Sequence, residues 1–174
     1  MSGILIVSIN PHDSTIIPVM GELVNESWGP DYVGVVDPVG FLRRAQYAAC
    51  AYAQGDALKD LDGVKGTVCI TRYHGCPDDY ADTRPYLGAL TAKKDLPWRQ
   101  RLQIVRALHN RAVQLVRISP ETYGKELYAT TDNWFMVVVL HALGLFSSKP
   151  RWWHYVRCGE TEIKSRFKLW KLNI

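Results

Sequence analysis

The sequence predicts one α/β domain over residues 1–174, built from about seven strands and about four helices. A chain of 174 residues with 47% hydrophobic content is long enough for one well-buried core and short for two. Segments with the two-residue period of a strand alternate with segments of helical period. Two neighbouring strand segments are separated only by Asp62 and Gly63, a tight-turn signal that predicts an antiparallel pair.

The N-terminal part is predicted to contain one strand followed by two helices. Residues 4–9, ILIVSI, are β-rich and end before Asn10 and Pro11, which predicts a strand. A helix is expected from Thr15, a capping residue, to about residue 29. Asp37 before Pro38 predicts a second helix that ends at Gly55. Its apolar residues recur at helical spacing: Phe41, Ala45, Ala48 and Tyr52.

The remaining elements complete the order strand, two helices, three strands, helix, strand, helix, two strands. The valine run at 137–139 has strand propensity, but it lies between a polar turn and Gly144, so we expect a helix over 133–144. The last two strands are expected to form a closing hairpin. The predicted ranges are strands 57–61, 64–73, 85–92, 125–131, 151–158 and 162–172, and a helix over 99–117.

The net charge, the cysteines and the apolar stretches limit the classes of protein to which the chain can belong. The formal charge of +4 and the pI near 8.9 suit an anionic ligand but fall short of a dedicated nucleic-acid binder. The four cysteines lack zinc-site spacing, so we expect reduced, mostly buried thiols and no metal. With no signal peptide and no uncharged apolar stretch of about 18 residues, a cytoplasmic protein without a membrane partner is expected.

Four motifs in this order resemble one known family: LDGVKGTVCI, YLGALTAKKD, RALHNRAVQLVR and LYATTDNWFMVVVLHALGL. Together they are similar to the GNAT superfamily of acyl-CoA-dependent N-acetyltransferases. The resemblance implies a GNAT-like mixed, mostly antiparallel sheet. It also implies acetyl-CoA as acyl donor and direct attack of an amine on the thioester. The acceptor stays open among a small molecule, a protein and a nucleic-acid base.

The resemblance also implies where acetyl-CoA binds. Main-chain groups of Leu90 and Ala92 would pair with its pantetheine arm, and its pyrophosphate would lie at the start of the following helix. The family's phosphate-loop glycines fall on Gln103 and Val105, so the loop is degenerate. Further residues expected around the cofactor are Gln100, Arg101, Arg106 and Asn133, with Lys93, Lys94 and Arg99 adding positive charge.

The catalytic groups are less clearly marked. The family's tyrosine that protonates the CoA thiolate falls on Leu140, so the neighbouring His141 is the substitute we expect, with Tyr128 and Tyr155 as further candidates. Glu22 is a candidate base or acceptor contact. Three other residues belong with it on the same grounds: Glu26, Asp31 and Tyr32.

Other readings stay open. A catalytically silent GNAT-like binding or regulatory protein would also explain the missing glycines and tyrosine, and it would fail to bind CoA. Aromatic residues in 151–158 could stack on bases, or cover the core or a homodimer interface. A metal-dependent hydrolase would use a loop cluster of His74, Asp78, Asp79 and Asp82, although these crowd one turn-rich loop.

Overall fold

The computed structural model describes residues 3–28, 37–53, 61–72, 85–123, 126–131, 138–139, 141–143, 146–147, 153–156, 162–165 and 168–173. Over these residues the chain forms helices α1–α4, one 3-10 turn and nine strands, and further helical residues lie at 138–139 and 141–142. Most strand pairs are antiparallel and one is parallel. The predicted fold class, a mixed and mainly antiparallel α/β protein, is therefore confirmed.

The chain divides into two compact units, residues 1–71 with 88–112 and residues 72–87 with 113–174. Strand β4, Tyr86–Ala92, begins in the second unit and continues into the first. Helix α3, Trp98–Ile118, begins in the first unit and ends in the second.

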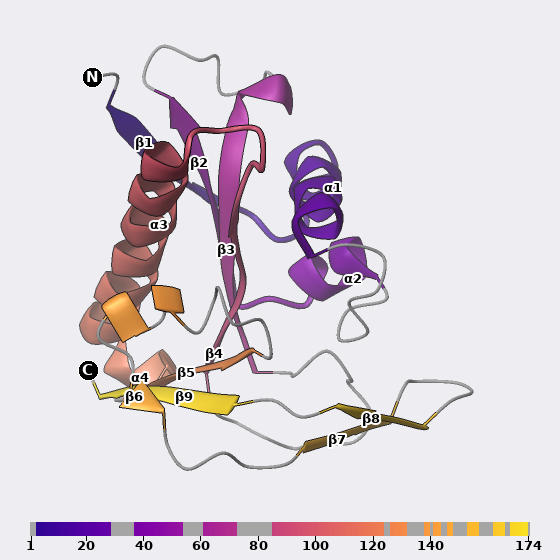
Figure 1. The fold of residues 1–174 in the computed structure, drawn as a ribbon, viewed down its shortest axis with the longest axis vertical. Helices are drawn as coiled ribbons and strands as arrows, with labels where there is room; N and C mark the ends of the chain where they lie inside the picture. The colour runs from indigo at the N-terminus through magenta and orange to yellow at the C-terminus, as the bar shows by residue number, and fades with distance from the viewer. Residues whose placement is uncertain are drawn as a thin grey trace. The chain divides into compact units, whose positions relative to one another are not determined.

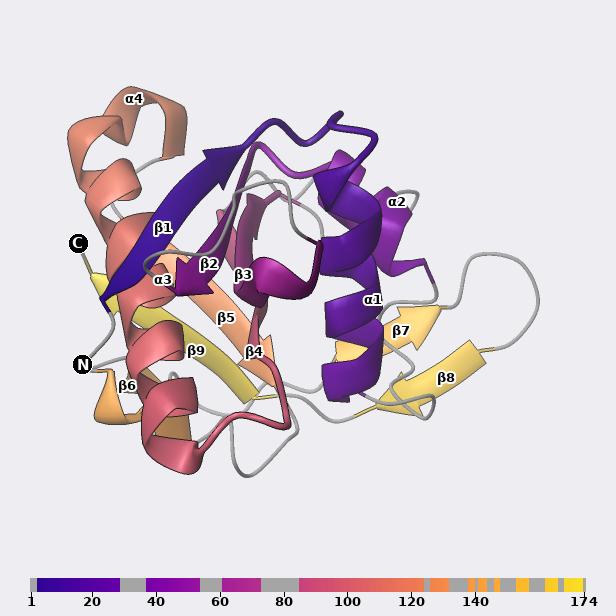
Figure 2. The ribbon, with the colours of Figure 1, turned by 90° about the horizontal axis from the view of Figure 1, so that it is seen from above.

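The first unit contains three further strands, β1 (Ile4–Ile9), β2 (Tyr47–Ala53) and β3 (Val64–Thr71), in the order β1-β2-β3-β4. Strand β1 pairs antiparallel with β2, and β2 pairs antiparallel with β3. Helices α1 (Ile16–Trp28) and α2 (Pro38–Arg43) cover one face of these strands, and α3 covers the other (Figures 1 and 2). The core of this unit is therefore closed on both faces of its sheet.

Acidic residues start the first two helices. Asp13 accepts hydrogen bonds from the backbone N–H groups of Thr15 (2.8 Å) and Ile16 (2.9 Å), so Asp13 rather than Thr15 makes the side-chain contact. Donation from Ile16, then from Thr15, lowers the pKa of the Asp13 carboxyl. Asp37 accepts from the Gly40 N–H at 2.8 Å, which confirms the predicted start of α2.

The predicted helix over 37–55 is wrong beyond Arg43. Helix α2 ends there, and residues Tyr47–Ala53 form β2. Six of these seven strand residues are buried, because helices cover both faces of the sheet. A strand buried on both faces reads as a continuous apolar run, so its alanines mimic the composition of a helix.

Helix α3 lies very close to the sheet at Gly66 of β3. A Cβ on Gly66 would be 2.5 Å from Ile104 Cγ2, 2.7 Å from the Thr91 carbonyl oxygen and 3.1 Å from Leu108 Cδ1. Those distances are shorter than van der Waals contact. The glycine therefore lets two turns of α3 and the end of β4 pack directly on β3.

The second unit contains β5 (Glu126–Thr131), β6 (Phe146–Ser147) and β9 (Lys168–Asn173), with β9 between the other two and antiparallel to both. Strand β5 also pairs in parallel with the start of β4, Tyr86 opposite Tyr128. Helix α4 is Pro120–Tyr123. The predicted hairpin forms between β7 (Trp153–Val156) and β8 (Glu162–Ser165), whereas β9 pairs with β5 instead.

Two predicted segments are described only in part. Residues 57–60 of one predicted strand lie outside the described residues, and Leu61–Gly63 form a 3-10 turn. In the predicted helix over 133–144, the described Val138, Val139 and His141 are helical. The Leu143 N–H donates to the Val139 carbonyl at 2.9 Å, as expected for a helical turn.

The described cysteines, Cys50 and Cys69, are free and buried, as predicted. Burial raises the pKa of the Cys50 thiol to about 11 and raises the pKa of Cys69 as well. Both are therefore protonated, unreactive core residues near neutral pH. Cys76 and Cys158 lie outside the described residues.

Replacing Gly66 with Ala is expected to lower the free energy of unfolding by about 2 kcal/mol, because the new methyl group overlaps Ile104 and the Thr91 carbonyl. Urea denaturation of the wild type and variant measures this. The double variant Gly66→Ala, Ile104→Ala should not recover stability, since the backbone oxygen remains. Wild-type stability of Gly66→Ala would contradict the close packing.

Candidate functional site

Strand β4 changes direction at Ala89. Ala89 has φ of 50°, in the left-handed region, although it is neither glycine nor asparagine. Its carbonyl oxygen accepts a hydrogen bond from the Thr67 hydroxyl at 2.7 Å, which fixes this conformation. Within the first unit, β4 is the last strand in the order. On the side of β4 away from β3, no further strand of that unit pairs with Leu90 and Ala92.

The turn from β4 into α3 is short and basic. Residues 93–97, KKDLP, connect Ala92 to Trp98. The Lys93 N–H donates to the Lys65 carbonyl at 2.9 Å, and the Pro97 carbonyl accepts from the N–H groups of Gln100 (2.9 Å) and Arg101 (3.0 Å). The helix therefore begins at Trp98. Lys93, Lys94, Arg99 and Arg101 outnumber Asp95 around this positive helix end, so the region suits an anion.

Three predicted cofactor residues lie within α3. Gln103 and Val105 lie in the second turn of α3, not in a loop. Val105 is buried and its backbone belongs to the helix, and its contact with the cofactor stays a prediction. Arg106 is exposed and lies eight residues after Trp98, about 12 Å along the axis at ~1.5 Å per residue.

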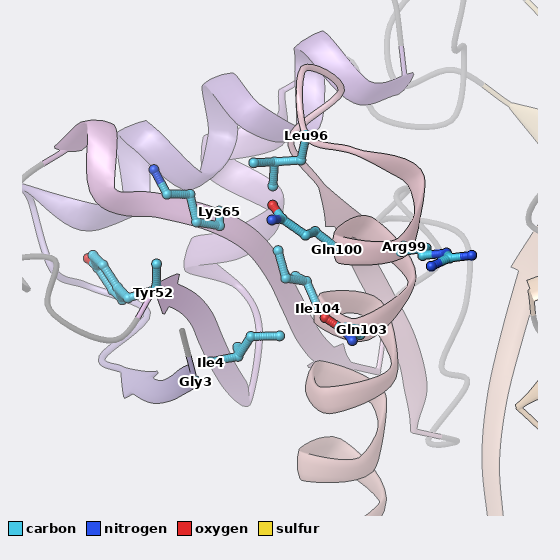
Figure 3. Close-up of a pocket in the computed structure, with 10 residues that line it drawn as sticks. Gly3, Ile4, Tyr52, Lys65, Leu96, Arg99, Gln100, Gln103 and Ile104 are labelled. Atoms are coloured by element: carbon cyan, nitrogen blue, oxygen red, sulfur yellow. The ribbon is translucent and has the colours of Figure 1, made fainter. Parts of the chain in front are cut away.

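A pocket of about 250 Å³ lies beside the first two turns of α3. Its apolar lining includes Ile4, Tyr52 and Ile104 (Figure 3). The polar residues that line it are Lys65, Arg99, Gln100 and Gln103. The remaining lining residues are Gly3, Ala53 and Leu96. The structure thus brings the predicted Gln100 and Gln103 together with residues of β1, β2 and β3, and not with Leu90 or Ala92.

Lys65 lines this pocket, and its ammonium group points away from Gln100 and Gln103 (Figure 3). Its Nζ donates to the Asp62 carbonyl at 3.1 Å, and Lys93 Nζ lies 3.5 Å from the same oxygen. The Arg99 guanidinium also points away from the other labelled side chains (Figure 3). None of the described residues that line the pocket is an Asp or a Glu.

In the second unit, Tyr128 is buried and its hydroxyl donates a hydrogen bond to the Glu126 carboxylate. The ring of Tyr128 also contacts that of Tyr86, with centroids 5.8 Å apart and planes tilted by 47°. The Tyr128 N–H donates to the Pro85 carbonyl at 2.9 Å. A phenol bonded to a carboxylate can pass a proton between a reacting group and that carboxylate.

The other catalytic candidates are exposed or lie outside the described residues. His141 is exposed on its helical turn, and Glu22 and Glu26 are exposed on α1. His109 of α3 is 3% exposed, and burial lowers its pKa, so it is a neutral core residue. The undescribed candidates are Asp31, Tyr32, His74, Asp78, Asp79, Asp82, Asn133 and Leu140, and the side chain of Tyr155.

Metal and membrane features can be assessed only where the structure describes the chain. There, no group of three or more His, Cys, Asp and Glu side chains is placed to bind a metal ion. In the same residues, no helix has the length and apolar content needed to span a membrane.

Sequence reasoning missed Lys65, Tyr52 and Glu126. Lys65 and Tyr52 come from strands far from α3 in the sequence, so only the fold joins them to Gln100. Glu126 had a local signal. It lies two residues before Tyr128 in a predicted strand, which places both side chains on one face.

Solved structures share this fold, although no protein-family model and no curated protein matches the sequence. An acetyltransferase of the GNAT family from Streptococcus pneumoniae has a TM-score of 0.60 at 17% identity, covering 99% of this chain and 100% of that one. The Escherichia coli ribosomal-protein-S18-alanine N-acetyltransferase gives 0.63 at 13% identity, with 99% and 94% covered. The NatC complex bound to Gag peptide and CoA gives 0.65 at 12% identity, with 100% and 99% covered.

The left-handed backbone at Ala89 predicts an unusual order of substitution effects. Ala89→Gly should stay within about 0.5 kcal/mol of the wild type, because glycine accepts this φ. Ala89→Val should lose about 2 kcal/mol, because a β-branched side chain clashes there. Urea unfolding of both variants measures the order. An ordinary strand would favour Val over Gly, and that result would contradict the left-handed conformation.

Proposed function

The chain has the fold of the GNAT acetyltransferases, and we propose that it is an acetyl-CoA-dependent N-acetyltransferase. One observation carries the proposal. After Ala89, β4 is the last strand of its unit and runs through a basic turn into the N-terminal end of α3. An extended thioester arm can pair with such an edge while its phosphates meet the helix end.

Solved structures with the same fold support acetyl-CoA as the acyl donor. A solved structure with this fold contains CoA, and others are named as acetyltransferases. Main-chain groups of Leu90 and Ala92 would hold the pantetheine arm. Lys93, Lys94 and Arg101 would lie around the pyrophosphate. The acceptor is an amine on a small molecule, a protein or a nucleic-acid base.

The chemical step needs a proton acceptor and later a proton donor. The amine nitrogen attacks the thioester carbonyl carbon, and the bond from that carbon to sulfur breaks. We propose that the amine proton passes through the Tyr128 hydroxyl to the Glu126 carboxylate, and returns along the same path to the CoA thiolate. His141 remains the alternative proton donor, and Glu22 the alternative acceptor contact.

Donor binding is tested by isothermal titration of the full chain with acetyl-CoA and with CoA. We expect saturable binding to both, and Lys94→Ala should raise Kd about tenfold through loss of a charge-assisted phosphate contact. Arg106→Ala also removes one positive charge, but this charge lies about 12 Å from Trp98 along the helix axis. It should therefore change Kd less than about twofold. No heat up to millimolar ligand would favour the silent binding protein instead.

Proton transfer is tested by release of CoA thiol from acetyl-CoA with a panel of small amines and peptides. Tyr128→Phe and Glu126→Gln should each lower turnover about a hundredfold while Kd for acetyl-CoA stays within about twofold. Tyr86→Phe is the matched control, because it removes a hydroxyl from the same ring pair and should stay near wild-type turnover. Full activity of Tyr128→Phe would exclude this path.

A further inference from the structure

We infer that Thr67 of β3 is a positioning residue for the proposed donor site, because its hydroxyl sets the direction in which the main-chain N–H of Leu90 points. The Thr67 hydroxyl donates to the Ala89 carbonyl oxygen at 2.7 Å, and Thr67 has no exposed surface. That this N–H serves acetyl-CoA rests on the proposed function, whereas its direction is a property of the chain alone. The two statements can therefore be tested separately.

The carbonyl that Thr67 contacts and the N–H of Leu90 belong to the same peptide group. That peptide group is trans. A trans peptide is planar, and its C=O and N–H bonds point in opposite directions. Because the Ala89 carbonyl points to Thr67 on β3, the Leu90 N–H points away from Thr67. It therefore lies on the side of β4 where no further strand of the first unit pairs.

The backbone conformation of Ala89 requires stabilising contacts. Its φ of 50° lies in the left-handed region, which is unfavourable for alanine. Such a conformation persists only where neighbouring groups stabilise it, and conformations of this kind are frequent at ligand sites. Ala89 is 1% exposed, so water has almost no access to replace the Thr67 hydroxyl as partner of the carbonyl.

The identity of residue 67 also favours a positioning role over simple packing. Seven of the eight residues of β3 are buried, and a valine would fill the same space as Thr67. A buried hydroxyl costs free energy unless it forms a hydrogen bond. Its bond goes to Ala89, the one described residue other than glycine with a positive φ.

The backbone on both sides of Ala89 is closely packed. A Cβ on Gly88 would lie 2.8 Å from Phe41 Cζ, and a Cβ on Gly66 would lie 2.7 Å from the Thr91 carbonyl oxygen. These parts of β4 have little room to move. Loss of the Thr67 hydroxyl should therefore change mainly the peptide groups next to Ala89.

NMR of the full chain, labelled with ¹³C and ¹⁵N, tests the direction of the peptide group without any ligand. Thr67→Val keeps the shape of the side chain and removes the hydroxyl, whereas Thr67→Ser keeps the hydroxyl. We expect the Cα and Cβ shifts and the HN–Hα coupling of Ala89 to leave their left-handed values in the valine variant only. Unchanged Ala89 signals in a folded Thr67→Val chain would overturn the inference.

Isothermal titration with acetyl-CoA tests the consequence for the donor site. Thr67→Val should raise Kd about tenfold, because the Leu90 N–H no longer points to the ligand, and Thr67→Ser should stay within about twofold of the wild type. Thr67→Cys carries a weaker donor and should give an intermediate Kd. It provides the same test if the valine variant does not fold.

Val68→Ala is the matched control, because Val68 is a buried neighbour in the same strand and does not carry the hydroxyl. It should lose stability in urea and leave Kd for acetyl-CoA within about twofold of the wild type. An equal rise of Kd in Val68→Ala and Thr67→Val would show a general loss of packing and overturn the positioning role.

Two further outcomes separate the inference from the proposed function. Wild-type affinity of Thr67→Val for acetyl-CoA would overturn the positioning role and leave the proposed function intact. Absence of acetyl-CoA binding by the wild type would contradict the proposed function and the role of Thr67 toward this ligand. The NMR comparison would then still support or contradict the control of the Leu90 N–H by Thr67.

Discussion

The close contact between α3 and β3 at Gly66 determines where the functional groups of the first unit lie. Because no side chain separates the two backbones, Ile104 and Leu108 reach the sheet directly. The first turns of α3 are then held beside the ends of β1, β2 and β3, where the pocket forms. The Thr91 carbonyl of β4 also packs against Gly66. A single residue of β3 therefore positions both β4 and α3.

The sequence predicted most elements of the first unit but not β2. Strand β1, the start of α2, β3, β4 and α3 carry local signals such as periodicity, capping residues and turns. The segment Tyr47–Ala53 lacks the alternation of a half-buried strand, because both of its faces are covered. Its alanines favour a helix locally, and only the packing of helices on both faces selects the strand.

The candidate site was predictable in part, for a similar reason. Gln100 and Gln103 were identified by alignment with a family motif, yet the structure places their side chains with Lys65 and Tyr52. The aligned motif residues 100–105 lie inside both the predicted helix, 99–117, and the observed α3. Inside the helix, the backbone N–H groups of 103 and 105 bond to helix carbonyls, so glycine is not needed there. No sequence spacing reports contacts between a helix and three distant strands.

The position of residues 103 and 105 inside α3 also determines what the missing glycines mean. In a phosphate loop, side chains at those positions would block the cofactor and suggest a silent protein. Inside a helix they cost nothing, and the donor groups for phosphate come from the turn before Trp98. The loss of the motif is therefore compatible with acetyl-CoA binding through β4 and the basic turn.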